Sequence, residues 1–132
     1  MSRAVAARII VCEPSPRWAV LLRCFAPELQ VSEARSLSLA DEMLPETPDS
    51  VLAVAVTNAN AGGVLLRLAR WQRDYPTCLT ATLLDELDDD FELALREAGA
   101  QLVIGSLFEL PRLARLAHRR KAHAKKLSCP AS

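Results

Sequence analysis

The sequence predicts an α/β protein built as a three-layer sandwich, in which one parallel sheet lies between two layers of helices. Short apolar runs rich in β-branched residues alternate with longer stretches in which apolar residues recur at helical spacing. The chain has 132 residues, which suits a single domain of common size. Its composition, 51% apolar with 4 glycines, is typical of a globular chain and excludes a disordered one.

Five segments have the composition of strands. Residues 8–12 and 51–56 are apolar on both faces, as expected of central strands that helices cover on both sides. Residues 29–34 are more polar and predict a second, shorter strand. The remaining two predicted strands are 78–84 and 101–105.

The first predicted helix follows the strand at 8–12. Ser15 is a candidate cap and Pro16 suits the first turn. Apolar residues then recur at a spacing of 3.6, and we expect Trp18, Leu22 and Phe25 to share one buried face.

Four further helices complete the alternation. Ser38 with an acid three residues later predicts the start of a short second helix. A third ends before Pro76. A fourth begins in the acidic run 85–90, whose charges complement its dipole, and ends at Gly99. The fifth is amphipathic and becomes strongly basic after 118.

Because each crossover between parallel strands is right-handed, five alternating units predict a doubly wound, flavodoxin-like sheet with strand order 2-1-3-4-5. We expect one domain over 1–126 and a flexible tail over 127–132. The functional crevice of this topology lies beyond the carboxyl ends of the first and third strands. Glu13 and Thr57 are expected to meet there.

Charge and hydropathy exclude several classes of protein. Sixteen basic residues balance sixteen acidic ones, so there is no general attraction to nucleic acid or to anionic lipid. The longest apolar run, 51–56, is far too short to span a membrane, and the amino-terminal residues lack the apolar core of a secretion signal. We therefore expect a cytoplasmic protein without a membrane partner.

The residues also disfavour cofactors, metals and enzymatic chemistry. The turn after the first strand carries two prolines where a phosphate site needs backbone amides, which argues against nucleotide or flavin. No metal-binding pair of cysteines is present, and we expect Cys12, Cys24 and Cys78 to be buried as small hydrophobes. No nucleophile elbow or zinc-protease motif occurs. We expect a protein that is not an enzyme and holds no cofactor.

Four stretches carry a resemblance to a known family: 63–67, 76–82, 98–100 and 106–108. They resemble the receiver domain of bacterial response regulators, and the resemblance spans residues 7–120. The turn 98–100 is similar to the family's Ala-Gly-Ala, and 106–108 stands where the family has Lys-Pro-Phe. Gly63 before an apolar helix and the proline-led segment 76–82 are similar as well. The resemblance implies two-component signalling, in which a partner kinase transfers a phosphoryl group to an aspartate with the help of magnesium.

The residues depart from the family where that chemistry occurs. Glu13 is the one acid left after the first strand, and Thr57 or its neighbour Val56 stands at the nucleophile position. Thr82, or Thr80, is the candidate for the hydroxyl position, and Ser106 replaces the family's lysine. An acyl phosphate needs a carboxylate, and a magnesium ion needs several oxygen ligands. The sequence therefore predicts a degenerate pseudo-receiver that is not phosphorylated.

A module without this chemistry is expected to act by contact with another protein, a signalling partner or output domain. The resemblance places the interaction face on the fourth helix, fifth strand and fifth helix, where opposite charges could pair in a homodimer. The residues of this face are Asp88, Asp89, Asp90, Arg112, Arg115 and Arg119.

Two alternatives stay open. The pocket could still be switched, by phosphorylation of Thr57 or by a small ligand. The basic end of the chain could associate with nucleic acid, although only Phe108 lies near it as an aromatic for base stacking.

Overall fold

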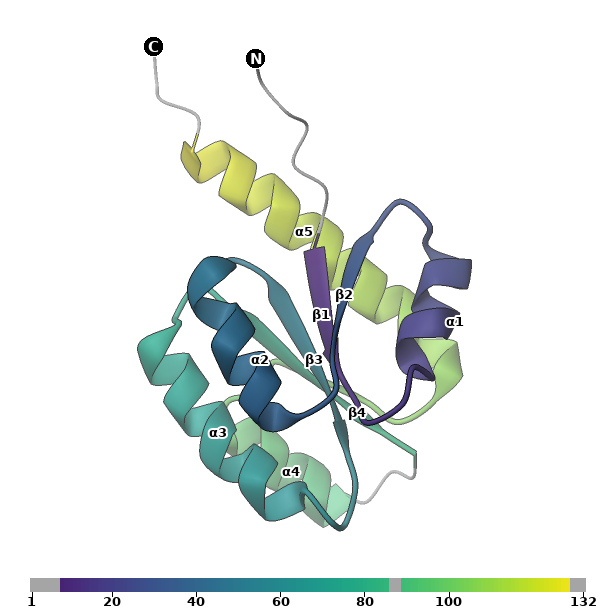
Figure 1. Cartoon of the computed structure of the whole chain (residues 1–132), viewed down its shortest axis with the longest axis vertical. Helices are drawn as coiled ribbons and strands as arrows, with labels where there is room; N and C mark the ends of the chain where they lie inside the picture. The colour runs from purple at the N-terminus through teal and green to yellow at the C-terminus, as the bar shows by residue number, and fades with distance from the viewer. Residues whose placement is uncertain (1–7, 86–88, 129–132) are drawn as a thin grey trace.

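Five parallel strands form one sheet with the order β2-β1-β3-β4-β5, which confirms the predicted topology (Figure 1). The computed structural model describes residues 8–85 and 89–128, with side chains described as far as Arg119. The strands are β1 (Arg8–Cys12), β2 (Gln30–Ala34), β3 (Val51–Val56), β4 (Leu79–Leu84) and β5 (Leu102–Ile104).

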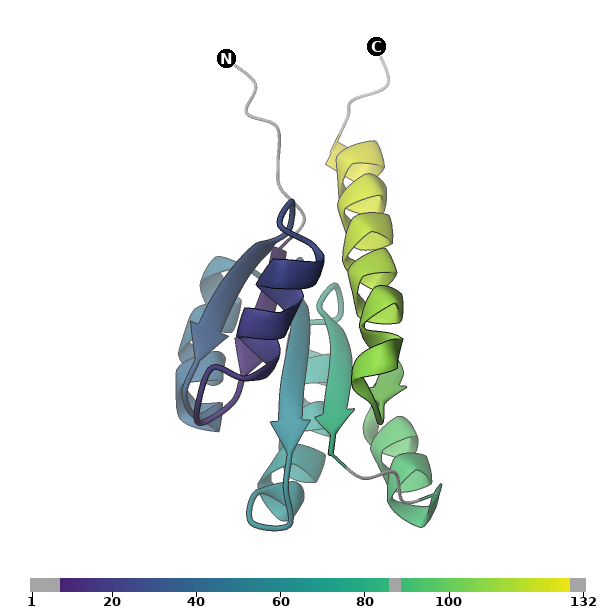
Figure 2. The same cartoon turned by 90° about the vertical axis from the view of Figure 1, so that its right-hand side faces the viewer.

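The helices cover both faces of the sheet. Helices α1 and α5 lie on one face, and α2, α3 and α4 lie on the other (Figure 2). The helices are α1 (Trp18–Phe25), α2 (Leu37–Met43), α3 (Ala61–Asp74), α4 (Asp89–Ala98) and α5 (Leu110–Ser128), with short 3-10 turns η1 (Leu44–Glu46) and η2 (Leu107–Glu109).

The alternating side chains of the central strands feed two apolar cores. Ile9 and Val11 of β1 pack on the side of α1 and α5, whereas Ile10 packs on the side of α2, α3 and α4. All three are at most 1% exposed, as continuous apolar runs in a doubly covered strand require. Each fully buried side chain of this size contributes about 1.5–3 kcal/mol of burial.

One predicted helix start differs from the structure, and one predicted helix end is confirmed. Helix α2 begins at Leu37, so Ser36 is its cap and accepts a hydrogen bond from the Leu39 amide at 3.1 Å, whereas Ser38 lies inside the first turn. At the carboxyl end of α4 the prediction is confirmed. Gly99 has φ +126, a conformation that favours glycine, and it ends the helix.

Two residues near the end of α1 are more exposed than the sequence predicts. Cys12 and Cys78 are buried as predicted, but Cys24 is exposed and Phe25 is half exposed. The chain leaves the helix at Ala26, and it is this next residue that is buried. Cys129 lies outside the described residues.

Helix α5 continues past the amino ends of the strands (Figure 2). The first two residues of the predicted tail, Leu127 and Ser128, are the last two residues of α5. The rest of the predicted tail lies outside the described residues. Among the described helices, none is both long and apolar enough to cross a membrane.

Candidate functional site

The carboxyl ends of the parallel strands lie along one edge of the sheet, toward the bottom of Figure 2. Glu13 follows β1 and is 3% exposed. Its two carboxylate oxygens accept hydrogen bonds from the backbone amides of Trp18 and Ala19, each at 2.9 Å. Glu13, and not Ser15, therefore caps α1, because these amides have no partner within the helix.

This position of Glu13 does not fit a magnesium site. Both carboxylate oxygens already accept from α1, and a hard cation needs several further oxygen ligands. Among the described residues, no three acidic, histidine or cysteine side chains lie close enough together to hold a metal. Burial also raises the pKa of the neighbouring Cys12 thiol to about 11, so this thiol is not a nucleophile at neutral pH.

An apolar pair occupies the carboxyl ends of β3 and β4. In the β3–β4 register Val56 lies opposite Leu84, and they are 6% and 3% exposed. Thr82 lies two residues earlier on β4, opposite Val54, and it is fully buried. The strand register therefore places Leu84, and not Thr82, beside Val56.

The Thr82 hydroxyl has no hydrogen-bond partner among the described residues. A buried hydroxyl without a partner lowers stability. Its neighbour on the same face, Thr80, donates to the Gly99 carbonyl oxygen at 3.0 Å. The two threonines therefore allow a matched comparison of a buried hydroxyl that has a hydrogen-bond partner, in Thr80, with one that has none among the described residues, in Thr82.

Replacing Thr82 by valine is expected to raise the free energy of unfolding by about 1 kcal/mol, because valine keeps the shape and removes the unpartnered hydroxyl. The same replacement at Thr80 is expected to lower it by about 1 kcal/mol. Urea unfolding followed by tryptophan fluorescence measures both changes. Equal destabilisation by the two variants contradicts the prediction.

The loop after β3 is held by its own side chains. The backbone amide of Thr57 donates to Asn60 Oδ1 at 2.7 Å, and the Asn60 side chain donates to the Ala55 carbonyl oxygen at 2.9 Å. Thr57 itself is exposed, and its hydroxyl accepts from the backbone amide of Asn60 at 3.4 Å. Thr57 and Glu13 thus lie at the same edge of the sheet, but each interacts with its own loop or helix.

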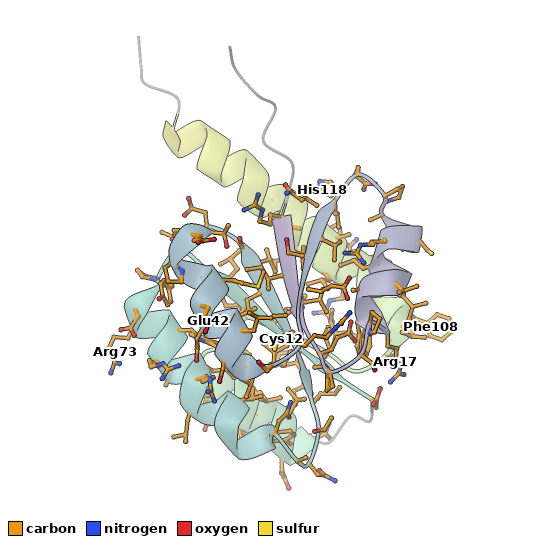
Figure 3. All side chains as sticks on the ribbon, in the orientation of Figure 1. Cys12, Arg17, Glu42, Arg73, Phe108 and His118 are labelled. Carbon is orange, nitrogen blue, oxygen red and sulfur yellow. The ribbon has the colours of Figure 1, made fainter. Side chains whose placement is uncertain are left out.

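Ser106 has a similar local role after β5. Its hydroxyl accepts from the Phe108 amide at 3.1 Å, and Glu109 accepts from the Gly105 amide at 3.1 Å. This reciprocal arrangement fixes the start of η2. Phe108 is 95% exposed and projects from the periphery of the molecule (Figure 3).

An ion pair joins the loops after β1 and β4. The Arg17 guanidinium donates to a carboxylate oxygen of Asp85, and both side chains are more than half exposed. Arg17 also lies over the ring of Trp18, 5.6 Å from its centroid. Figure 3 shows Arg17 at the start of α1.

A groove of about 940 Å³, here called the β3–β4 groove, opens between the loop that follows β3, the carboxyl end of β4 and the first turns of α3 and α4. Its lining is apolar at the strand ends and carries two carboxylates. The lining residues are Val56, Thr57, Asn58, Ala61, Leu84, Asp85, Asp90, Phe91 and Ala94.

The predicted interaction face is exposed wherever it is described. Asp89 and Asp90 lie in the first turn of α4, while Asp88 lies outside the described residues. Arg115 and Arg119 line a second groove of about 620 Å³ between α5 and the open edge of β5. Arg112 lines it too and pairs with Glu109 at 2.6 Å.

Sequence reasoning did not find three features of this edge: Leu84 opposite Val56, the capping role of Glu13, and the Arg17–Asp85 pair. The first needs the strand register, and the second joins residues five and six positions apart. The Arg17–Asp85 pair could have been predicted from the sequence, because both residues follow strands whose carboxyl ends lie at one edge of the sheet.

No protein-family model and no curated protein matches this sequence. Solved structures do match. A response regulator from Thermotoga maritima has a TM-score of 0.76 at 18% identity, covering 89% of this chain and 99% of that one. A CheY-like protein, TadZ, from Pseudomonas aeruginosa has a TM-score of 0.71 at 22% identity, covering 86% and 98%.

The beryllofluoride-activated NtrC4 receiver domain dimer also matches, with a TM-score of 0.71 at 15% identity, covering 87% of this chain and 98% of that one. The chain therefore has the fold of response-regulator receiver domains, as the resemblance in the sequence predicts.

Proposed function

We propose that this chain is a pseudo-receiver, a signalling module that accepts no phosphoryl group and acts by binding another protein. One observation carries the proposal: where the chemistry needs a carboxylate at the end of β3, Val56 lies opposite Leu84. No acid occurs between Val51 and Gly63 to replace it. Glu13 supports the proposal, since its oxygens are engaged by α1.

Incubation with magnesium and acetyl phosphate tests this proposal. We expect no mass increase of the intact protein and no change in tryptophan fluorescence, because Trp18 lies beside Glu13 and reports on this edge. Beryllofluoride with magnesium is expected to give no spectral change either. A phosphorylated species, or a saturable response to beryllofluoride, contradicts the proposal.

We further propose that α4, β5 and α5 form the association face and can pair two copies. The support is an open sheet edge beside exposed Arg115 and Arg119, with Asp89 and Asp90 exposed at the start of α4. Opposite charges on one surface can pair twice across a two-fold axis. The exposed aromatic ring of Phe108 suits a protein contact as well.

Reversing both charges in an R115E/R119E variant is expected to weaken self-association about tenfold or more, because like charges then face Asp89 and Asp90. Light scattering over a range of protein and salt concentrations measures it. Adding D89R and D90R to the same chain should restore pairing. An R73E variant, altered at an exposed arginine of α3, serves as the control. Unchanged association in R115E/R119E rules out this face.

A further inference from the structure

The β3–β4 groove remains without a role in the chemistry of phosphoryl transfer. Its floor is formed by Val56 and Leu84, both nearly fully buried, with Ala61 and Ala94 on its walls. Phe91, which is half-buried, completes the apolar lining. Because the wall residues are small, the groove leaves room beside an apolar floor and can receive an apolar side chain from outside.

The rim of the groove has one sign of charge. Asp85 and Asp90 line it, and the exposed Asp89 lies next to it in the first turn of α4. None of the described lining residues is basic. A ligand that enters here meets carboxylates around an apolar floor, and this combination favours a cation attached to an apolar group.

We propose that the β3–β4 groove binds a basic segment of another protein, with an apolar side chain on the Val56–Leu84 floor and arginine or lysine side chains on the rim carboxylates. This inference rests on the proposed function, in which the module acts by contact, and it names the partner's chemistry. The groove shares Asp90 with the association face, but it has no lining residue in common with the second groove between β5 and α5.

Arg17 regulates this site, because its guanidinium already occupies one rim carboxylate. It reaches Asp85 from the loop after β1 and is not part of the groove lining. A basic partner competes with Arg17 for Asp85. Removing Arg17 should therefore tighten binding, whereas removing Asp85 should weaken it, so the two members of one ion pair act in opposite directions.

Fluorescence anisotropy with a defined probe tests the proposal. The probe is a fluorescein-labelled peptide, Gly-Arg-Arg-Leu-Leu-Arg-Arg-Gly, measured with the full chain. A D85N/D90N variant is expected to bind it about tenfold more weakly, and an R17Q variant about threefold more tightly. E97Q removes a charge from the far end of α4 and is expected to bind like the unaltered protein. A peptide with serines in place of the leucines should bind at least about fivefold more weakly.

Three results overturn the inference: binding that D85N/D90N leaves unchanged, equal binding of the serine peptide, or the absence of saturable binding. Self-association of the chain that D85N/D90N abolishes and R115E/R119E leaves intact also overturns it, because the groove then belongs to a second copy. Thermal unfolding of each variant checks that it is folded. Failure here leaves the proposed function standing, since only a response to acetyl phosphate or beryllofluoride overturns the non-phosphorylated module.

Discussion

Replacing Glu13 by alanine is expected to lower the free energy of unfolding by about 3 kcal/mol. The carboxylate is buried and accepts from two amides in the first turn of α1, so its loss leaves two buried donors without a partner. It also removes a negative charge from the positive end of the helix dipole. Glutamine keeps one acceptor oxygen and is expected to cost about half as much.

Urea unfolding followed by the fluorescence of Trp18 and Trp71 measures this loss. Ser15→Ala is the matched control, because Ser15 is the cap that the sequence suggests, yet the structure gives its side chain no capping bond. We expect S15A to change stability by less than about 0.5 kcal/mol. A loss in S15A equal to that in E13A would contradict the assignment of the α1 cap to Glu13 rather than Ser15.

The strands could be predicted closely because the sheet is covered on both faces. In β1 and β3 both faces are apolar, so the sequence shows a continuous run with sharp ends, and the predicted bounds 8–12 and 51–56 match the structure. The order of strands followed from the handedness of the crossovers and not from any single residue. Helix starts were harder to predict because they depend on the side chain that satisfies the first amides.

The candidate site shows the limit of a linear alignment. Thr82 was the natural hydroxyl candidate because a threonine near the end of β4 is what the family has. The register, however, pairs Val56 with Leu84 and places Thr82 one step deeper. Register depends on hydrogen bonds between strands that are far apart in sequence, and a shift of two residues leaves the apolar alternation unchanged.

The carboxyl edge of this sheet has become a set of separate local structures. Glu13 caps α1, Asn60 closes the loop after β3, and Glu109 with Ser106 fixes the turn after β5. These polar side chains hydrogen bond to backbone groups of their own loops and helix starts. The apolar pair between them, Val56 and Leu84, leaves a groove suited to a side chain of another protein.

Replacing Asp41 by asparagine is expected to cost about 2 kcal/mol at pH 7, because this residue of α2 joins three side chains of α3. Oδ2 accepts from Arg67 at 3.0 Å and from Arg70 at 2.8 Å, and Oδ1 accepts from the Trp71 indole at 2.6 Å. Hydrogen bonds to a charged group are worth about 1.5–3 kcal/mol. The Asp41 carboxylate and its two arginine partners are partly exposed, so the net stabilisation is moderate.

The cost should depend on pH with a definite sign. Burial by itself raises the pKa of Asp41, but the hydrogen bonds from Trp71, Arg67 and Arg70 outweigh it and hold the pKa below its ordinary value of 3.8. A carboxyl whose pKa is lower in the folded state stabilises the fold above its unfolded pKa, and this contribution is lost as the pH falls through the folded pKa. The difference between the unaltered protein and D41N should therefore be full above about pH 5 and should shrink as the pH falls below 3.8 and through the lower folded-state pKa.

Urea unfolding at a series of pH values between about 2.5 and 7 tests this dependence. D74N, at an exposed aspartate paired with its neighbour Arg73, is the control and should change stability by less than about 0.5 kcal/mol. A D41N cost that stays constant with pH would show that the charge of Asp41 does not hold α2 to α3. A cost that disappears with acid would identify this carboxylate as the electrostatic link between the two helices, one of which forms a wall of the β3–β4 groove.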